Sequence, residues 1–508
     1  MTHTLWDLPS TTSDKDDSGA SRLDHSVQSV PASARLPPVG QDARESLYND
    51  FAGVIRHNSA LDRSLVSFQA NRGVPFYSWF KYREGFSESL VTYLLQHLHP
   101  HPGHLLDPFA GGGSALFAAR KLGWRTEGIE VLPVGAYSIQ ARLRTDHLVV
   151  ASFAAEVTCL LTENFATHYD SAFAFHHIAI TRGAYPEEEE RQLVGYLAYC
   201  HRHVQDEDIR GLLLYAAFCV LEDISYTRKD GQYLRWDVRS GRSAGKRPFN
   251  KGYLMSFREA ITSKLRQMLM DLQRVGGQPS LFAEPPQATT AEHPLILHEG
   301  SCLYLLPTMQ AESFDFVLTS PPYANRYDYT RTYALELVFL GRDAEQVKQL
   351  RQTMLSCTVE NREKRAQLEA YYQELGRTDD FHTIEAVFQQ QQALQEVLGI
   401  LDQYRREGKL NNENIARLVR NYFYEMCFVT FELARLLRPG GRVAMVNDNV
   451  RYAGEEVPVD LILSDFARSF GLTVRHIWTL GRGKGNSSQQ MGNHGRTELR
   501  KCVYVWEK

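Results

Sequence analysis

Apolar positions along the chain follow two spacings, one typical of helices and the other typical of strands. Leucines recur at helical spacing just after Ser87, a residue type that caps helices, at Leu90, Leu94, Leu95 and Leu98. A short apolar strand with Leu105 and Leu106 comes next, followed by a glycine-rich loop, a second helix that stops at Gly123 and a strand over residues 125–131. This order predicts a strand–helix–strand unit.

The same alternation returns further along the chain. Its segments are 295–306, a strand at 314–320, a long helix at 412–437, and strands at 442–448, 472–480 and 500–506. Strands that alternate with helices favour a parallel sheet, whereas the last two strands, with no helix between them, indicate one antiparallel strand. The pattern therefore predicts an α/β fold with a largely parallel sheet.

Segments without this pattern divide the chain. Few large apolar residues occur early in the chain, which predicts a disordered N-terminal arm over residues 1–45. Residues 145–292 have helical periodicity, a basic stretch and a Pro/Ala/Thr-rich exit, and are predicted to form an inserted domain. The Gln/Glu/Arg/Leu-rich residues 342–410 predict a helical insertion whose charged pattern is typical of a solvated face or partner surface. The α/β domain is then expected in three parts, 46–144, 293–341 and 411–508.

Composition limits the class of protein. The chain has 508 residues, 43% of them apolar and 23% charged, as in folded proteins with more than one core. Its net charge is −4 and its pI about 6.5, so contacts with nucleic acid need local basic patches. Its seven cysteines form no CxxC pair, and we expect no metal. The N-terminus does not resemble a secretion signal, and the longest apolar run, Gly211 to Leu221, is too short to span a membrane, which predicts a cytoplasmic protein.

A proline-rich loop follows the apolar residues 314–318 of this strand and reads Thr319, Ser320, Pro321, Pro322 and Tyr323. Open α/β sheets bind ligands at this end of their strands. Two consecutive prolines lack N–H donors and fix the backbone, so the carbonyls of Ser320 and Pro321 stay available to accept from an amine. Tyr323 adds a flat face on which a flipped base can stack. A plain proline-stiffened turn is the alternative, but the strand end and a second motif favour a catalytic loop.

The second motif is the glycine-rich loop, with Asp107, Pro108, Phe109, Ala110, Gly111 and Gly113. Its glycines let the backbone approach a ligand and its position exposes the N–H groups that begin a helix. A phosphate loop is the alternative, but the Gly-Lys-Ser/Thr of such loops is missing and Asp107 would repel phosphate. Glu130 ends the next strand, where it can accept hydrogen bonds from ribose hydroxyls. An adenosyl cofactor without phosphates, such as S-adenosylmethionine, fits best.

Taken together, these motifs resemble the amino-methylating DNA methyltransferases of restriction–modification type. An Asp-Pro-Phe-x-Gly-x-Gly cofactor loop and an (Asp/Asn/Ser)-Pro-Pro-Tyr catalytic loop define that family, and both are present in register. The resemblance implies a class I S-adenosylmethionine-dependent methyltransferase fold, with a seven-stranded Rossmann-like sheet that has one antiparallel strand. It adds Thr319 and Ser301 to the cofactor contacts, the latter where many members carry an acidic residue. It also makes residues 76–89 a cofactor-contacting segment and the inserted domain a target-recognition domain.

Basic residues gather in two segments outside these motifs. The inserted domain interleaves cations with aromatic residues and includes Arg228, Lys229, Arg235 and Arg239. That composition is expected where phosphates are neutralised and bases are stacked, although a solvated hairpin is an equal alternative. A second segment, the long loop at 481–499, carries Arg482 and Lys484 and is predicted to close over DNA, with an ordinary mobile loop as its alternative.

These motifs predict methyl transfer to the N4 amine of cytosine in double-stranded DNA, because in the resembled family a Ser-Pro-Pro-Tyr loop usually goes with that base. N6 of adenine is the alternative acceptor, and RNA bases and a binding module without turnover remain alternative classes. No Pro-Cys nucleophile motif occurs, so covalent C5 methylation is disfavoured. We find no nuclease motif, and any cleavage of unmodified DNA would need a separate restriction endonuclease.

Overall fold

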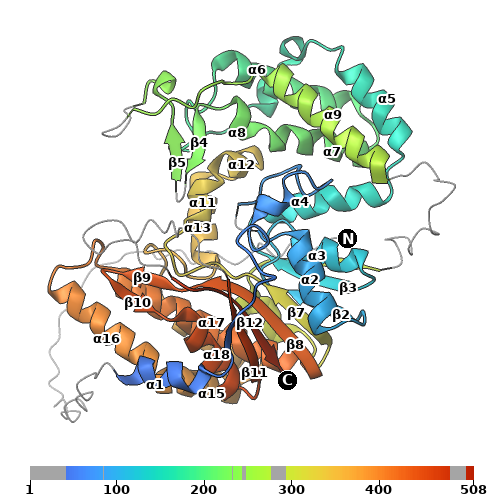
Figure 1. Cartoon of the computed structure of the whole chain (residues 1–508). Helices are drawn as coiled ribbons and strands as arrows, with labels where there is room; N and C mark the ends of the chain where they lie inside the picture. The colour runs from blue at the N-terminus through green and yellow to red at the C-terminus, as the bar shows by residue number, and fades with distance from the viewer. Residues whose placement is uncertain (1–41, 84, 231–232, 243–247, 276–292, 481–498) are drawn as a thin grey trace, which may run out of the picture. The chain divides into compact units, whose positions relative to one another are not determined.

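The computed structural model describes residues 42–83, 85–230, 233–242, 248–275, 293–480 and 499–508 (Figure 1). By its contacts the chain divides into two units, 1–39 and 40–508, and the elements below belong to the second. The predicted N-terminal arm lies almost wholly outside the described residues and stays a prediction.

A mixed sheet of eight strands forms the centre of the second unit, in the order β1-β11-β12-β8-β7-β2-β3-β6. The strands are β1 (Ile55–His57), β2 (His104–Asp107), β3 (Arg125–Glu130), β6 (Leu295–Glu299), β7 (Phe314–Thr319), β8 (Leu437–Asp448), β11 (Thr473–Thr479) and β12 (Lys501–Glu507). Every pairing is parallel except those of β12, which runs antiparallel to both β11 and β8. The α/β class and the antiparallel strand are therefore confirmed.

The sheet differs from the expected one by a strand. β1 pairs in parallel with β11, from Ile55 beside Ile477 to His57 beside Thr479, and brings the total to eight instead of seven. Three residues are too few to form a recognisable alternation of apolar and polar positions. A second difference is that β8 begins at Leu437, directly after helix α17, so the strand expected at 442–448 also includes residues 437–441.

Helices cover both faces of the sheet because side chains of successive strand residues point to opposite sides. Leu106 and Val317 join one core, and their neighbours Leu105 and Phe316 join another. The helices of the α/β domain are α2 (Glu88–Leu98), α3 (Ser114–Lys121), α4 (Pro133–Leu143), α10 (Cys302–Leu305), α11 (Tyr329–Thr332), α12 (Ala334–Phe339), α17 (Ile415–Leu436) and α18 (Val459–Ser469). The predicted cap of α2 is confirmed, because Ser87 Oγ accepts from the Leu90 N–H at 3.1 Å.

The first insertion builds a core of its own with α4, α12 and α13. Its elements are α5 (Val150–Leu160), α6 (Glu187–His203), α7 (Glu207–Cys219), α8 (Leu221–Ile224), the hairpin β4 (Thr227–Asp230) and β5 (Tyr233–Trp236), and α9 (Phe257–Val275). The long apolar run lies mainly in α7 and is buried in this core. No helix among the described residues combines the length and the apolar character needed to cross a membrane.

Most of the second insertion belongs to the main core. It contains α13 (Ala344–Thr353), α14 (Arg365–Glu374), α15 (Thr378–Gln390) and α16 (Gln392–Arg406), and α16 also contacts the N-terminal helix α1 (Asp42–Phe51). The apolar faces of α14, α15 and α16, including Phe381 and Leu401, are buried in the core on the α17 side of the sheet, whereas α13 packs in the core of the first insertion. Most of the charged residues lie on the outer faces of these helices, as the charge pattern indicated, but the pattern did not show that their apolar faces join a core. A small hairpin of β9 (Val450–Tyr452) and β10 (Glu455–Val457) completes the fold.

Candidate active site

The glycine-rich loop between β2 and α3 has a backbone that glycine adopts most easily. Gly111 and Gly113 have φ values of +54° and +78°, in the left-handed region. A Cβ atom added to Gly111 would also lie 2.9 Å from Cε1 of Tyr82, whose ring covers the loop. Space and conformation therefore both require glycine at this position.

Asp107 ends β2 and is buried under this loop. Its carboxylate accepts hydrogen bonds from Thr319 Oγ1 at 2.7 Å and from the Phe109 N–H at 3.1 Å. Burial raises the pKa of Asp107 to about 7, because these hydrogen bonds replace only part of the lost hydration. Thr319 is fully buried, donates to Asp107 and lies outside the cavity wall described below, and its predicted cofactor contact stays a prediction.

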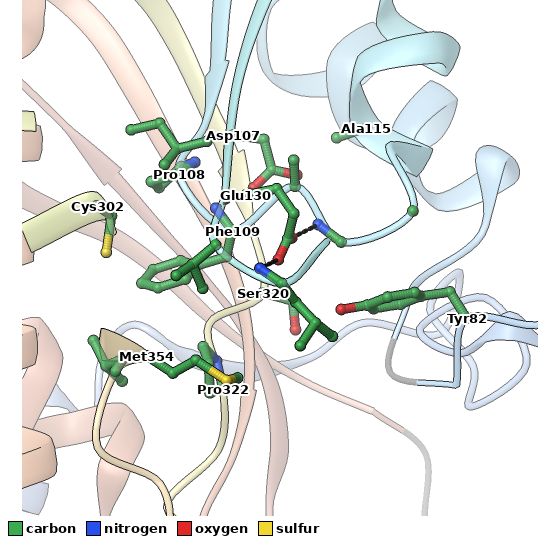
Figure 2. Close-up of a pocket in the computed structure, with 18 of the residues that line it drawn as sticks. Tyr82, Asp107, Pro108, Phe109, Ala115, Glu130, Cys302, Ser320, Pro322 and Met354 are labelled. Carbon is green, nitrogen blue, oxygen red and sulfur yellow. Dashed lines mark hydrogen bonds between the residues drawn. The ribbon is translucent and has the colours of Figure 1, made fainter. Parts of the chain in front are cut away.

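Glu130 ends β3 and is tied to the same loop. Its Oε2 accepts from the Gly111 N–H at 2.5 Å and its Oε1 accepts from the Leu132 N–H at 2.7 Å (Figure 2). Burial raises the pKa of Glu130 to about 8, and the nearby Asp107 adds to this effect. Among the residues that the structure describes, no basic side chain pairs with either carboxylate. Two buried carboxylates without a counter-ion favour a cationic ligand.

The predicted catalytic loop begins at the end of β7. Ser320 Oγ donates to the Tyr323 hydroxyl at 3.3 Å, and the Lys501 ammonium lies 6.0 Å from the centre of the Tyr323 ring. Directly after the loop, the carbonyl of Ala324 accepts a hydrogen bond from the Tyr452 hydroxyl. The loop is thus held by an internal hydrogen bond and, at its carboxyl end, by contacts with residues of β9 and β12.

A solvent-open cavity joins the two loops (Figure 2). Among the predicted residues, its wall contains Asp107, Pro108, Phe109, Ala110, Gly111, Glu130, Ser301, Ser320 and Pro322. Gly113, Thr319, Pro321 and Tyr323 lie outside this wall. The structure therefore brings most of the predicted cofactor residues and the predicted catalytic serine to one site, at the carboxyl ends of β2, β3 and β7.

The cavity wall also includes residues that the sequence analysis did not name. Tyr82 stacks on Tyr333 with ring centres 5.3 Å apart and belongs to the segment 76–89 that the resemblance had indicated. Met354 and Leu355 come from the second insertion, where no motif marks them. Only the folded chain reveals their place, because more than thirty residues separate them from Ser320 in sequence.

The basic hairpin β4–β5 divides into exposed and buried cations. Arg228 is exposed and Arg235 half-buried, and their guanidinium groups lie 5.8 and 4.3 Å from the ring centre of Phe249. Arg239 is exposed but forms a bidentate pair with Asp237 at 2.8 and 2.9 Å.

Lys229 corrects the predicted set of DNA contacts. Its side chain is only 3% exposed, and its ammonium pairs with the equally buried carboxylate of Glu336. A cation enclosed in this way cannot reach a phosphate, because strand alternation turns Lys229 inward where Arg228 points outward. Arg482 and Lys484 lie outside the described residues, so their predicted role stays a prediction.

Comparison with known proteins finds relatives over nearly the whole chain. The chain is 43% identical over 471 residues to "Type II methyltransferase M.AvaI" of Nostoc sp., an alignment that covers 91% of this chain and 93% of that protein. The same values hold for M.AvaI of Anabaena variabilis. "Type II methyltransferase M.BsoBI" of Geobacillus stearothermophilus is 37% identical over 491 residues, or 92% of each chain. No family model and no solved structure matches the chain.

Proposed function

Because the chain belongs to the DNA methyltransferase family of type II restriction–modification systems, we propose that it transfers a methyl group from S-adenosylmethionine to the N4 amine of cytosine in double-stranded DNA. The Ser-Pro-Pro-Tyr form of the catalytic loop supports this base. The observation that carries the proposal is the shared cavity, whose wall holds Ser320 and Pro322 together with Asp107 and Glu130. Cleavage of unmodified DNA is left to a separate endonuclease.

The residues of the cavity fit S-adenosylmethionine. This cofactor has a sulfonium and an ammonium group and no phosphate, which suits a site with two buried carboxylates and no paired cation among the described residues. Asp107 attracts its cationic amino-acid part, Glu130 accepts from the ribose hydroxyls through lone pairs that the backbone leaves free, and Ser301 borders the adenine. The bound cofactor supplies an electrophilic methyl group.

The catalytic loop orients the nucleophile. The target cytosine leaves the DNA stack and lies against the ring of Tyr323. Its amine donates hydrogen bonds to Ser320 and to the Pro321 carbonyl, which turns the nitrogen lone pair away from the ring and makes it a better nucleophile. The prolines keep these acceptors in place, so the loop needs no covalent nucleophile of its own.

The first insertion, residues 145–292, is the DNA-recognition domain in this proposal. Arg228 and Arg235 project from its hairpin beside Phe249, and Arg239 lies just beyond. Cations interleaved with aromatic rings neutralise phosphates and stack against bases, so these arginines are the candidate contacts with the duplex. Arg482 and Lys484 are proposed to add contacts from the loop between β11 and β12.

Identification of the methylated nucleoside tests the proposal directly. The purified protein is incubated with methyl-labelled S-adenosylmethionine and unmethylated genomic DNA or total RNA, and the digested nucleosides are separated. We expect the label in N4-methylcytosine from DNA. Label in N6-methyladenine would keep the mechanism and refute the base, whereas label in RNA, or in neither polymer, would refute the substrate.

The affinity for S-adenosylmethionine should rise with pH. The pKa values of Asp107 and Glu130 are raised to about 7 and about 8, and a cationic ligand prefers both groups deprotonated. The dissociation constant should therefore fall about tenfold or more between roughly pH 6 and pH 8. Titration calorimetry at several pH values measures it.

Asp107→Asn provides the control, because it keeps the shape of the side chain and removes one titration. This variant should bind more weakly and depend less on pH. A flat wild-type profile would contradict the role of the carboxylates.

The same raised pKa values have the opposite effect on folding without ligand. The folded state holds extra protons, so its stability falls as pH rises from about 4 towards 8.

A further inference from the structure

A loop of the second insertion forms part of the cavity wall. Met354 follows α13 directly and Leu355 comes next, and both side chains are buried. They line the cavity together with Phe109 and Cys302, and Figure 2 shows Met354 extending toward Pro322. This side of the cavity is apolar, in contrast to the side with Asp107 and Glu130.

A buried charged cluster fixes the conformation of this loop. The Ser356 N–H donates to Glu425 Oε2 at 2.8 Å, and the Ser356 hydroxyl donates to the same carboxylate. Lys364 Nζ lies 2.8 and 2.9 Å from the two oxygens of Glu425 and also donates to the Met354 carbonyl at 2.9 Å. Ser356, Lys364 and Glu425 are no more than 5% exposed. Buried charges require their partners, so this cluster strongly favours one backbone path past the cavity.

The same loop is attached to the segment that follows the catalytic loop. Cys357 Sγ donates to the Tyr327 carbonyl at 3.3 Å. Arg351 pairs with Asp328 at 3.1 Å and donates to Thr330 Oγ1 at 2.8 Å. These contacts therefore fix the position of the second insertion relative to both the cofactor cavity and the catalytic loop.

We propose that the second insertion completes the cofactor site: Met354 and Leu355 contact the bound cofactor, and Ser356, Lys364 and Glu425 are positioning residues that set its affinity. This inference rests on the proposed function for the identity of the ligand. The carboxylates serve the cationic and hydroxyl groups of an adenosyl ligand, and the apolar residues bury the faces of its ring, as apolar walls do in other small-molecule sites. In this proposal the second insertion, which has no recognisable motif, contacts the cofactor directly.

Truncation of the wall tests the contact. Leu355→Ala and Met354→Ala should each weaken the binding of S-adenosylmethionine and of its product S-adenosylhomocysteine about tenfold in calorimetry, because several apolar carbons lose their burial. Leu401→Ala is the matched control, since Leu401 is buried in the same core as Leu355 and lies outside the cavity wall. It should lower the melting temperature and leave both dissociation constants unchanged.

The positioning role is tested by Ser356→Ala. We expect the KM for the cofactor to rise several-fold while kcat and the KM for DNA stay near the wild-type values. Ser464→Ala is the control. It removes another fully buried hydroxyl, which accepts a hydrogen bond from the Trp506 indole at 3.1 Å, and it should change the stability of the protein alone. A purely structural role for Ser356 would make the two variants behave alike.

The outcomes separate this inference from the proposed function. Wild-type affinity in Leu355→Ala and Met354→Ala, or an equal loss in Leu401→Ala, would overturn the contact. Failure of the wild-type protein to bind S-adenosylmethionine would instead refute the proposed function, on which the inference rests. Weaker binding in the wall variants alone, with DNA methylation retained at saturating cofactor, is the expected result.

Discussion

Tyr323→Ala should lower kcat/KM for DNA methylation about 100-fold or more while the affinity for S-adenosylmethionine stays close to that of the wild type. The ring lies outside the cavity wall, so its loss leaves the cofactor contacts intact. Stacking of one base on an aromatic side chain contributes about 1–3 kcal/mol, and a misplaced reacting group adds a further loss of rate. Single-turnover methylation and calorimetry with the cofactor measure the two quantities.

Tyr323→Phe is the matched control for this prediction. It keeps the aromatic face and removes only the hydroxyl that accepts from Ser320 at 3.3 Å. One neutral hydrogen bond contributes about 1 kcal/mol, so the rate should fall roughly five- to tenfold. Equal losses in the two variants would show that the hydroxyl matters and the flat face does not, which would contradict the stacking role.

Lys229→Met should lower the free energy of unfolding by about 3–5 kcal/mol, because it leaves a buried carboxylate without its partner. Glu336 is 1% exposed, burial already raises its pKa, and the Lys229 ammonium opposes that rise. The cation also lies 4.8 Å from the ring centre of Tyr333 and 5.2 Å from that of Phe80, contacts that methionine replaces only in part. Denaturant unfolding followed by fluorescence measures the loss.

The neighbouring Arg228→Ala separates stability from DNA binding. Arg228 is exposed, so its loss should change the unfolding free energy by no more than about 0.5 kcal/mol. It should weaken DNA binding and reduce its dependence on salt, as expected for a lost phosphate contact. If Lys229→Met proved as stable as the wild type and weakened DNA binding like Arg228→Ala, the buried pair would have no structural role. The double variant Lys229→Met/Glu336→Leu should regain part of the stability.

Much of the fold could be predicted because the strands on both sides of the cavity are short apolar runs followed by conspicuous loops. Leu105 and Leu106 precede the glycines, and the apolar residues 314–318 precede two prolines, so the end of each strand was marked in the sequence. β1 was missed because three residues carry no periodicity. The place of the second insertion in the core was not predicted, because Gln, Glu and Arg residues separate the apolar positions that hold its helices there.

The site was predictable where one motif supplied several of its residues and unpredictable where distant segments meet. Asp107, Glu130 and Ser320 stand at strand ends, and parallel strands bring those ends together at one edge. Met354 and Leu355 carry no chemical signature of their own. Lys229 was misplaced because composition reveals a basic patch but does not show which cations face inward. The direction of each side chain depends on the register of β4 with β5, and for Lys229 also on Glu336, more than a hundred residues away.

The position of β12 has a consequence for synthesis of the protein. This strand lies between β8 and β11 and pairs with both, yet it is translated after every other strand of the sheet. At about 5–20 residues per second, the ribosome needs roughly 3–10 s to reach it after β8. During that interval the nascent chain exposes an unpaired edge of β8 and, once β11 has been made, an unpaired edge of β11 as well, and such edges are sites of aggregation. Chaperones that bind extended segments therefore have their clearest opportunity in the last seconds of translation.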